Sequence, residues 1–322
     1  MKPLFITSAY GEMYAPFLLV TLESLTVSHY GCPVRIYWQD FSPAVINALR
    51  AAFPDYVFYK TNYDLVGSAR VRIPSKLNLW REALEAAPDG PVCLIDSDVI
   101  IRKNIISYFQ EMEADVLFTD KPEQFPLNTG VMLFHNGPAA KAFMRMWHAR
   151  TLALIDDEQA LHIAISDKYP YGAADQMSLH LMLTYSPPRK QYEISADGLI
   201  VRLSALPCEE LNETRSVNIT DKTHIIHYKG GWRDILLYGR NFTRNRPRKQ
   251  SRDMYRLYLQ TYLNAQRRLQ HSGITASREI FPLTIPFYLR PQGITERAGM
   301  YPFWHSWSLG KQIVRRLKKV FC

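Results

Sequence analysis

The stretch Cys93-Leu94-Ile95-Asp96-Ser97-Asp98-Val99 governs the interpretation of this 322-residue chain. The short apolar run over 92–95 predicts a buried strand, and two carboxylates at i and i+2 follow it directly. Asp96 and Asp98 can therefore share a divalent cation that prefers oxygen ligands, such as Mn²⁺ or Mg²⁺, and through it a diphosphate. Asp-x-Asp also arises by chance, and the alternative is a strand-end turn with solvated carboxylates.

Strand and helix signals alternate through roughly the first 240 residues. The expected strands are 4–8, 34–38, 56–59, 92–95, 128–135 and 223–228, with a pair of short strands over 192–203. The expected helices are 17–27, 43–53, 138–150, 176–183 and one that begins at Pro74 and runs to about residue 87. This succession predicts an α/β fold with a mixed, mainly parallel sheet and helices on both faces. Ligands bind beyond the carboxyl ends of the strands in such sheets, where Asp96 and Asp98 are expected.

The composition is that of a globular protein, with 47% hydrophobic and 21% charged residues. No apolar run reaches the length of about 18 residues that a transmembrane helix needs. The chain enters its first expected strand at once, so we expect no signal peptide and a cytoplasmic location. Three glycosylation sequons are then chance matches, because glycosylation requires secretion: Asn212, Asn218 and Asn241. The four cysteines lack Cys-x-x-Cys spacing, which argues against a zinc site or disulfides.

Positive charge is concentrated toward the C-terminal end of the sequence. The segment from Arg240 to Cys322 holds 17 Lys and Arg residues against three Asp and Glu, a formal charge of +14. Because the whole chain carries +9, the remainder carries −5. We expect residues 239–322 to form a basic, mainly helical extension, with a helix over 251–270, and to have an anionic partner.

Residues 300–322 have the pattern of a helix at a membrane surface. Ile313, Leu317 and Val320 share one helical stripe, and Lys and Arg residues occupy much of the remaining surface. Such a helix suits the headgroup region of an anionic membrane, so we expect peripheral membrane contact. The alternative is a helix docked on the protein's own core, with the lysine stems lying along it. No nucleic-acid-binding motif is found, so nucleic acid is not an expected partner.

Three further segments carry polar residues suited to a site. His227 follows an apolar strand and precedes a glycine pair, so its imidazole can face a cleft; the alternative is a hydrogen-bonded core histidine. The segment Asn128-Thr129-Gly130 places an amide and a hydroxyl beside a glycine, where they can contact sugar hydroxyls. Asp175 and Gln176 stand at the start of a helix, where Asp175 can contact a reacting sugar or cap the helix.

Taken in this order, these segments resemble the nucleotide-sugar-dependent glycosyltransferases of the Rossmann-like GT-A fold, most closely glycosyltransferase family 8. The matching run covers about residues 4–238 and begins with residues 6–16, which are similar to the family's first strand and nucleotide loop. The resemblance implies a GT-A catalytic domain over 1–238, followed by the extension over 239–322. The chain departs from the family pattern at Gly11-Glu12-Met13, before the loop tyrosine, and at Arg233-Asp234-Ile235, where Lys-Pro-Trp is usual.

The resemblance also implies roles for individual residues. The divalent metal, usually manganese, would be ligated by Asp96, Asp98 and His227. The donor sugar would be surrounded by the catalytic group Asn128, Asp175 and Gln176. The nucleotide and its diphosphate would be contacted by Thr7, Ala9, Tyr14, Arg70, Lys76, Asp96, Ser97, Gly230 and Arg233. For Arg70 and Lys76, a solvated helix face is an equal alternative.

These observations favour transfer of a hexose from a nucleotide-diphosphate sugar, first of all a UDP-sugar, to a glycan or glycolipid acceptor of the bacterial lipopolysaccharide type. Family 8 enzymes retain the anomeric configuration, so we expect retention; Asp175 acting as a general base would instead allow inversion. Two alternatives stay open. One is a phosphohydrolase of the haloacid dehalogenase type with Asp96 as nucleophile, although the downstream elements of that family are not found. The other is an inactive, transferase-like binding protein.

Overall fold

The computed structural model describes residues 1–121, 127–157, 159–160, 174–185, 190–214, 219–229, 236 and 249–283. The chain divides into two units, Met1–Thr284 and Ile285–Cys322, and all described residues lie in the first. The expected membrane-surface helix over 300–322 and the expected domain boundary at residues 238–239 both lie outside the described residues, so both stay predictions.

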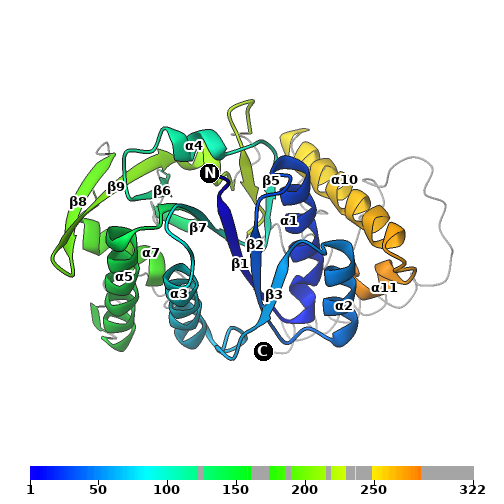
Figure 1. The fold of residues 1–322 in the computed structure, drawn as a ribbon, viewed down its shortest axis with the longest axis horizontal. Coiled ribbons are helices and arrows are strands. Elements are labelled where there is room, and N and C mark those ends of the chain that lie inside the picture. The colour runs from blue at the N-terminus through cyan, green and yellow to red at the C-terminus, as the bar shows by residue number, and fades with distance from the viewer. Residues whose placement is uncertain are drawn as a thin grey trace, which may run out of the picture. The chain divides into compact units, whose positions relative to one another are not determined.

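An eight-stranded sheet forms the centre of the first unit, in the order β3-β2-β1-β4-β7-β6-β9-β8 (Figure 1). Its strands are β1 (Leu4–Tyr10), β2 (Val34–Gln39), β3 (Val57–Lys60), β4 (Pro91–Asp96), β6 (Val116–Asp120), β7 (Leu127–His135), β8 (Gln191–Ala196) and β9 (Leu199–Pro207). The first four run parallel, and β6 runs parallel to β9. β7 is antiparallel to both of its neighbours, and β8 is an antiparallel edge strand. The expected mixed, mainly parallel sheet is confirmed.

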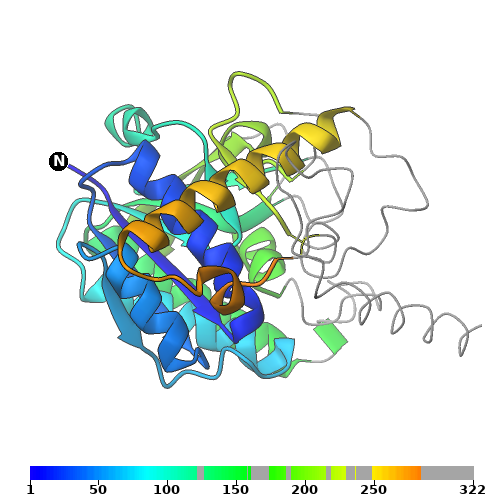
Figure 2. The same ribbon diagram turned by 90° about the vertical axis from the view of Figure 1, so that its right-hand side faces the viewer.

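Helices cover both faces of this sheet (Figures 1 and 2). One face carries α3 (Ala69–Glu85), α5 (Pro138–Asp156) and α7 (Ala174–Leu183), and the other carries α1 (Ala15–Ser28), α2 (Pro43–Ala52) and α10 (Lys249–His271). Short helices are η1 (Glu12–Tyr14), α4 (Ile106–Gln110), α8 (Cys208–Leu211) and α11 (Ser277–Ile280). Because side chains alternate along a strand, Ile6 and Leu94 join the core under α3 and α5.

A second, two-stranded sheet lies beside the large one. It pairs β5 (Val99–Ile101) with β10 (Ile225–His227) in antiparallel register. The hydroxyl of Thr21, on α1, lies 2.8 Å from the carbonyl oxygens of both Ser97 and Val99. The buried helix α1 therefore holds the turn that links β4 to β5, and this turn contains the Asp-Ser-Asp segment.

The expectation that a helix begins at Pro74 is wrong, because α3 begins at Ala69 and Pro74 lies inside it. The Ser68 carbonyl already accepts the amide N–H groups of Val71 and Arg72, at 3.0 and 2.8 Å. Proline has no N–H to continue this ladder, so the helix lacks the bond to the carbonyl four residues back. The earlier start places Arg70 on the same helix as Lys76.

Helix α10 belongs to the first compact unit and packs along α1, as the view in Figure 2 shows. Its buried face is rich in aromatic side chains: Met254, Tyr255, Tyr258, Leu259, Tyr262 and Leu269. A helix was expected here from the sequence, over 251–270. Within the described part of the chain, no helix combines the length and the apolar character that crossing a membrane requires.

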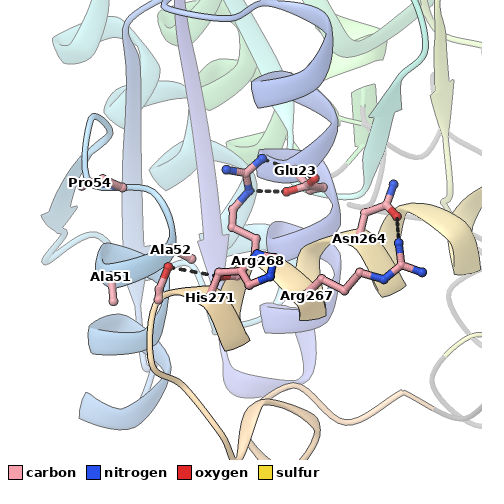
Figure 3. A pocket seen from close by; sticks show the side chains of 9 residues that line it. Glu23, Ala51, Ala52, Pro54, Asn264, Arg267, Arg268 and His271 are labelled. Carbon is pink, nitrogen blue, oxygen red and sulfur yellow. Dashed lines mark hydrogen bonds and ion pairs between the residues drawn. The ribbon is translucent and has the colours of Figure 1, made fainter.

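An ion pair closes the contact between α10 and α1 (Figure 3). Nε of Arg268 lies 2.6 Å from Oε2 of Glu23, whose side chain is only 5% exposed. The same guanidinium lies 5.6 Å from the ring centroid of Phe53, at the end of α2. The hollow drawn in Figure 3 lies between these three helices and contains none of the predicted site residues. We therefore interpret this hollow as a gap in the packing of the three helices and not as a ligand site.

Candidate metal and donor site

The two aspartates stand at the carboxyl end of β4, as the sequence predicts. Asp96 is the last residue of the strand and pairs in register with Ser8 of β1. Its side chain is 25% exposed, whereas Ser97 and Asp98 are buried. One carboxylate therefore reaches the open edge of the sheet, while the other lies beneath it.

His227 joins the aspartates because β10 pairs with the strand that follows them. In this pairing His227 lies opposite Val99, one residue beyond Asp98. Its Nε2 atom lies 3.0 Å from Oδ1 of Asp98 and 3.6 Å from Oδ2 of Asp96. A hydrogen-bonded core histidine would make the same 3.0 Å contact with Asp98, so ligation of a metal by His227 stays a prediction.

The three side chains fit a divalent cation. One ligand atom from each of Asp96, Asp98 and His227 lies within 4.8 Å of the other two. Two carboxylate oxygens and an imidazole nitrogen suit Mn²⁺ well and Mg²⁺ less well, since Mg²⁺ favours an all-oxygen shell.

Gly130 leaves the space that this cluster occupies. A Cβ atom at this position would lie 2.5 Å from Cε1 and 2.8 Å from Nδ1 of His227, and 2.9 Å from Oδ2 of Asp96. Such distances are shorter than carbon can make without displacing its neighbours. The glycine of the Asn128-Thr129-Gly130 segment is thus required for the imidazole and the carboxylate to approach each other.

Helix α3 brings cations to the same edge of the sheet. Nζ of Lys76 forms an ion pair with Oδ1 of Asp96 and lies 4.1 Å from the ring centroid of Trp80. Arg70 is exposed in the first turn of this helix. Lys76 therefore lies beside Asp96, and its predicted contact with the donor stays a prediction.

The residues predicted to hold the base and ribose lie on β1 and just after it. Thr7 and Ala9 are fully buried, and Tyr14 is half-buried at the end of η1. The ring of Tyr14 lies 4.8 Å from that of Tyr10, and the guanidinium of Arg72 lies 5.5 Å from the Tyr10 ring. This end of β1 is therefore lined with aromatic rings, and its binding role stays a prediction.

Asp175, one of the predicted donor-sugar residues, contacts β7 through Thr129, and Asn128 precedes Thr129 on that strand. Thr129 donates a hydrogen bond of 2.6 Å to Oδ2 of the buried Asp175, and Trp147 Nε1 donates to the Asp175 carbonyl at 2.9 Å. Within the described residues, Oδ1 of Asp175 and Nδ2 of Asn128 are buried without a partner. Gln176 is half-buried beside Asp175. An unpartnered acceptor and an unpartnered donor are complementary to sugar hydroxyls, which can serve as both.

Two residues near the cluster were missed by the sequence analysis. Asn212, set aside there as a chance sequon, is fully buried, and its Oδ1 lies 2.9 Å from Nδ1 of His227. Lys229 lies two residues beyond this histidine; burial, reinforced by nearby Lys121, lowers the pKa of Lys229 to about 8. Lys229 could have been found from its position beside the glycine pair, whereas no sequence signal connects Asn212 with His227. Gly230 and Arg233, both predicted to meet the diphosphate, lie outside the described residues.

Comparison with known proteins supports this interpretation of the architecture. Residues 48–229 match the family model described as nucleotide-diphospho-sugar transferase. A search of curated proteins finds no match. Among solved structures, the glycosyltransferase GlyE of Streptococcus pneumoniae TIGR4 is similar with a TM-score of 0.53 and 14% identity, over 86% of this chain and 64% of GlyE. The bifunctional glycosyltransferase WbbM, in its apo form, is similar with a TM-score of 0.50 and 13% identity, over 87% of this chain and 51% of WbbM.

The chain thus spans less than two thirds of the length of either structure. At these identities the likeness establishes the fold, which is the GT-A architecture that the sequence predicted. The family model covers more than half of the chain, and its matched segment includes the candidate metal-ligand cluster of Asp96, Asp98 and His227. The chain therefore belongs to the nucleotide-diphospho-sugar transferase family.

Proposed function

We propose that this protein is a glycosyltransferase of the family 8 type, which moves a hexose from a nucleotide-diphosphate sugar to a glycan or glycolipid acceptor. A UDP-sugar is the first donor to test and Mn²⁺ the first cation. The observation that carries the proposal is the convergence of Asp96, Asp98 and His227 at the carboxyl end of β4.

The residues of the cluster would bind the cation, and through it the diphosphate of the donor. A bound dication supplies positive charge that offsets the charge developing on the departing diphosphate. Asp96, Asp98 and His227 would hold it, and Gly130 keeps the space between them free. Lys76, now paired with Asp96, would turn toward phosphate oxygen once that carboxylate has another partner.

The sugar would be held from the other side of the sheet's edge. Asn128 Nδ2 and Asp175 Oδ1 offer a buried donor and a buried acceptor, and Thr129 fixes the second oxygen of Asp175 at 2.6 Å. This supports binding and orientation of a hexose rather than proton abstraction from an acceptor, and so favours retention. NMR of the product's anomeric centre distinguishes retention from inversion.

A thermal-shift screen of nucleotide sugars with and without Mn²⁺ tests the proposal. Ligand at about 100 times its Kd adds about 2.7 kcal/mol to the free energy of unfolding, so the true donor should raise the Tm. Asp98→Asn should abolish the part that depends on Mn²⁺, whereas Asp89→Asn, on an exposed ion pair with Lys141, should not. Release of nucleoside diphosphate from the stabilising donor then confirms turnover.

Two outcomes of this screen count against the proposal. Absence of any Mn²⁺-dependent stabilisation by a nucleotide sugar would favour the inactive, transferase-like binding protein. Release of phosphate from simple phosphomonoesters with Mg²⁺ would favour the haloacid dehalogenase-type alternative, in which Asp96 is the nucleophile.

The acceptor is proposed to be membrane-bound, with the protein cytoplasmic and peripheral. The cationic segment 300–322 supports this proposal through its charge and its amphipathic pattern. Deleting these residues should release the protein from anionic liposomes while slow hydrolysis of the donor continues. Liposome binding that is unchanged by the deletion would contradict it.

A further inference from the structure

A chain of buried hydrogen bonds runs from the metal-ligand cluster into the sheet. Nδ1 of His227 lies 2.9 Å from Oδ1 of Asn212, and Nδ2 of Asn212 lies 3.1 Å from Oγ1 of Thr119. The Thr119 hydroxyl in turn lies 3.1 Å from the carbonyl oxygen of Asn128. Asn212 and Thr119 are fully inaccessible to solvent, so water does not compete for these bonds.

The direction of every bond in this chain follows from its last member. A backbone carbonyl can only accept a hydrogen bond, so the Thr119 hydroxyl donates its single proton to the carbonyl oxygen of Asn128. The Thr119 oxygen can then only accept, which requires the NH₂ group of Asn212 to face it. The Asn212 oxygen must therefore face the imidazole, and Nδ1 of His227 must carry the proton.

Among the described residues, Cys208 also contacts the Thr119 hydroxyl, and this contact leaves the direction of the bonds unchanged. The thiol of Cys208 interacts with Thr119, and burial raises the pKa of that thiol to about 12. The sulfur is therefore protonated at neutral pH, and a neutral thiol accepts a hydrogen bond from the hydroxyl more weakly than a thiolate would. The Thr119 proton stays with the Asn128 carbonyl.

The backbone keeps Asn212 in register with the strand that carries the histidine. The amide of Asn212 donates to the Cys208 carbonyl at 2.9 Å, which ends α8. The next residue, Glu213, donates its amide to Ile225 at 3.1 Å, and its carbonyl accepts the His227 amide at 2.9 Å. The ladder between β6 and β7 is irregular between Leu117 and Thr119, which sets Thr119 opposite Asn128.

We infer that Asn212 and Thr119 are positioning residues that hold His227 as its Nδ1–H tautomer and so present the lone pair of Nε2 to the cation. Neither residue is one of the three proposed ligands of the cation. The inference rests on the proposed function only in taking Nε2 as the metal-ligating atom. Residues that orient a ligating histidine in this way typically contribute a factor of about 10 to 100 in metal affinity.

The direct test is nitrogen NMR of the His227 imidazole at neutral pH, and its readout is the proton on Nδ1. Nε2 is not the readout in the metal-free protein, because it lies 3.0 Å from Oδ1 of Asp98 and can donate a hydrogen bond to it. The His227 signals are assigned with a His227→Gln variant. We expect a protonated Nδ1, which donates to Asn212. A wild-type ring without a proton on Nδ1 overturns the inference, whatever the enzyme turns over, so its failure is distinguishable from failure of the proposed transferase activity.

Two variants test the individual members of the chain. Thr119→Val keeps the shape but removes both bonds, so Asn212 is free to turn; we expect a mixture of tautomers and a Kd for Mn²⁺, measured by electron paramagnetic resonance, about 10 to 100 times weaker. Asn212→Asp keeps an acceptor at Nδ1, so its Kd should stay close to that of wild type. Unchanged tautomer and Kd in Thr119→Val overturn the role of Thr119.

A control separates this effect from general damage to the core. Asn136 is also fully buried, and its Nδ2 lies 3.0 Å from the Leu84 carbonyl at the far end of β7. Asn136→Leu should destabilise the fold about as much as Asn212→Leu, and only Asn212→Leu should weaken Mn²⁺ binding. Equal losses of Mn²⁺ affinity in the two variants would show that stability, not tautomer control, sets the affinity.

Discussion

The backbone amide of Tyr228 donates a hydrogen bond of 2.8 Å to the carbonyl oxygen of Asp98. This bond ties the strand that carries His227 to the turn that carries both aspartates. The Tyr228 hydroxyl also donates to the Met254 carbonyl of α10 at 2.8 Å, and its ring lies 5.0 Å from that of Tyr258. Helix α10, which the sequence analysis placed in the basic extension, thus packs against Tyr228 beside the metal-ligand cluster.

Gly130 is the position where the smallest change should damage the cluster. In Gly130→Ala the new methyl group meets His227 and Asp96 at less than 3 Å. We expect a loss of about 1–3 kcal/mol in the free energy of unfolding and a Mn²⁺ affinity at least about tenfold weaker. Chemical denaturation and metal titration measure the two effects.

Gly137→Ala is the matched control for that substitution. Gly137 follows the same strand, and a Cβ there has its nearest neighbour, the His135 carbonyl oxygen, at 4.0 Å. Both measured quantities should stay close to wild type. If Gly130→Ala binds Mn²⁺ as tightly as Gly137→Ala does, the three side chains do not share an ion.

The Arg268–Glu23 pair should make the attachment of α10 sensitive to a single side chain. Arg268→Met leaves the buried Glu23 carboxylate without its partner, which typically costs about 3–5 kcal/mol. Because Arg268 is one third exposed, we expect about 2–3 kcal/mol in urea denaturation. The neighbouring Arg267 is exposed and bonds only to Asn264 among the described contacts, so Arg267→Met should change stability by less than about 0.5 kcal/mol. Equal effects of the two substitutions would contradict a structural role for the pair.

His29 should make the fold less stable in mild acid. Its ring is buried, its Nε2 accepts the Ile105 amide at 3.0 Å, and burial lowers its pKa to about 4, from 6.5 in the unfolded chain. Between these two values the unfolded chain binds the extra proton, so stability is full above pH 6.5 and falls as the pH drops toward 4. The loss approaches about 1.4 kcal/mol per pH unit from this residue.

Urea denaturation between pH 7 and 4.5 measures that dependence. His29→Gln should start from a lower stability but show a flatter decline with falling pH. His271→Gln, with an exposed side chain at the end of α10, should follow the wild-type curve. A His29→Gln curve parallel to that of wild type would assign the acid sensitivity to other groups.

Local signals explain which parts of the site the sequence could predict. Asp96, Asp98 and His227 each stand at the end of an apolar run, and the carboxyl end of a strand is where the architecture opens to ligand. Asn212 carries no such signal, because its contact with His227 depends on a bridge between Glu213 and Ile226 of β10, which are not close in sequence. Its sequon indicates N-glycosylation, whereas the structure shows a buried contact with His227.

Short elements and tertiary packing limited the prediction of the fold. Strand β5 has three residues, too few for any periodicity, and it forms because Thr21 and β10 hold it. Pro74 is a strong signal for the start of a helix, but α3 begins earlier, at Ala69. The amides of Val71 and Arg72 already donate to the Ser68 carbonyl and form the first turn. The continuous apolar run of β4 and the helical spacing of apolar residues in α5 could be predicted, because each pattern reports directly which faces of the element are buried.

Asp175 is the residue whose substitution best separates binding of the metal from handling of the sugar. In Asp175→Asn the Thr129 hydroxyl keeps an acceptor, so the local structure should persist. The buried, unpartnered Oδ1 loses its charge or becomes a donor, which removes an acceptor for a sugar hydroxyl. We expect kcat to fall by at least about 100-fold, since losing one charged contact in the transition state costs about 3 kcal/mol. The Kd for Mn²⁺ should be unchanged, because the metal-ligand cluster does not include this carboxylate.

Asp157→Asn, which changes an exposed carboxylate at the end of α5, should leave both kcat and the Kd for Mn²⁺ unchanged. A Mn²⁺ affinity that falls together with kcat would mean that Asp175 supports the cluster instead of the sugar, and a normal kcat would remove it from the catalytic group.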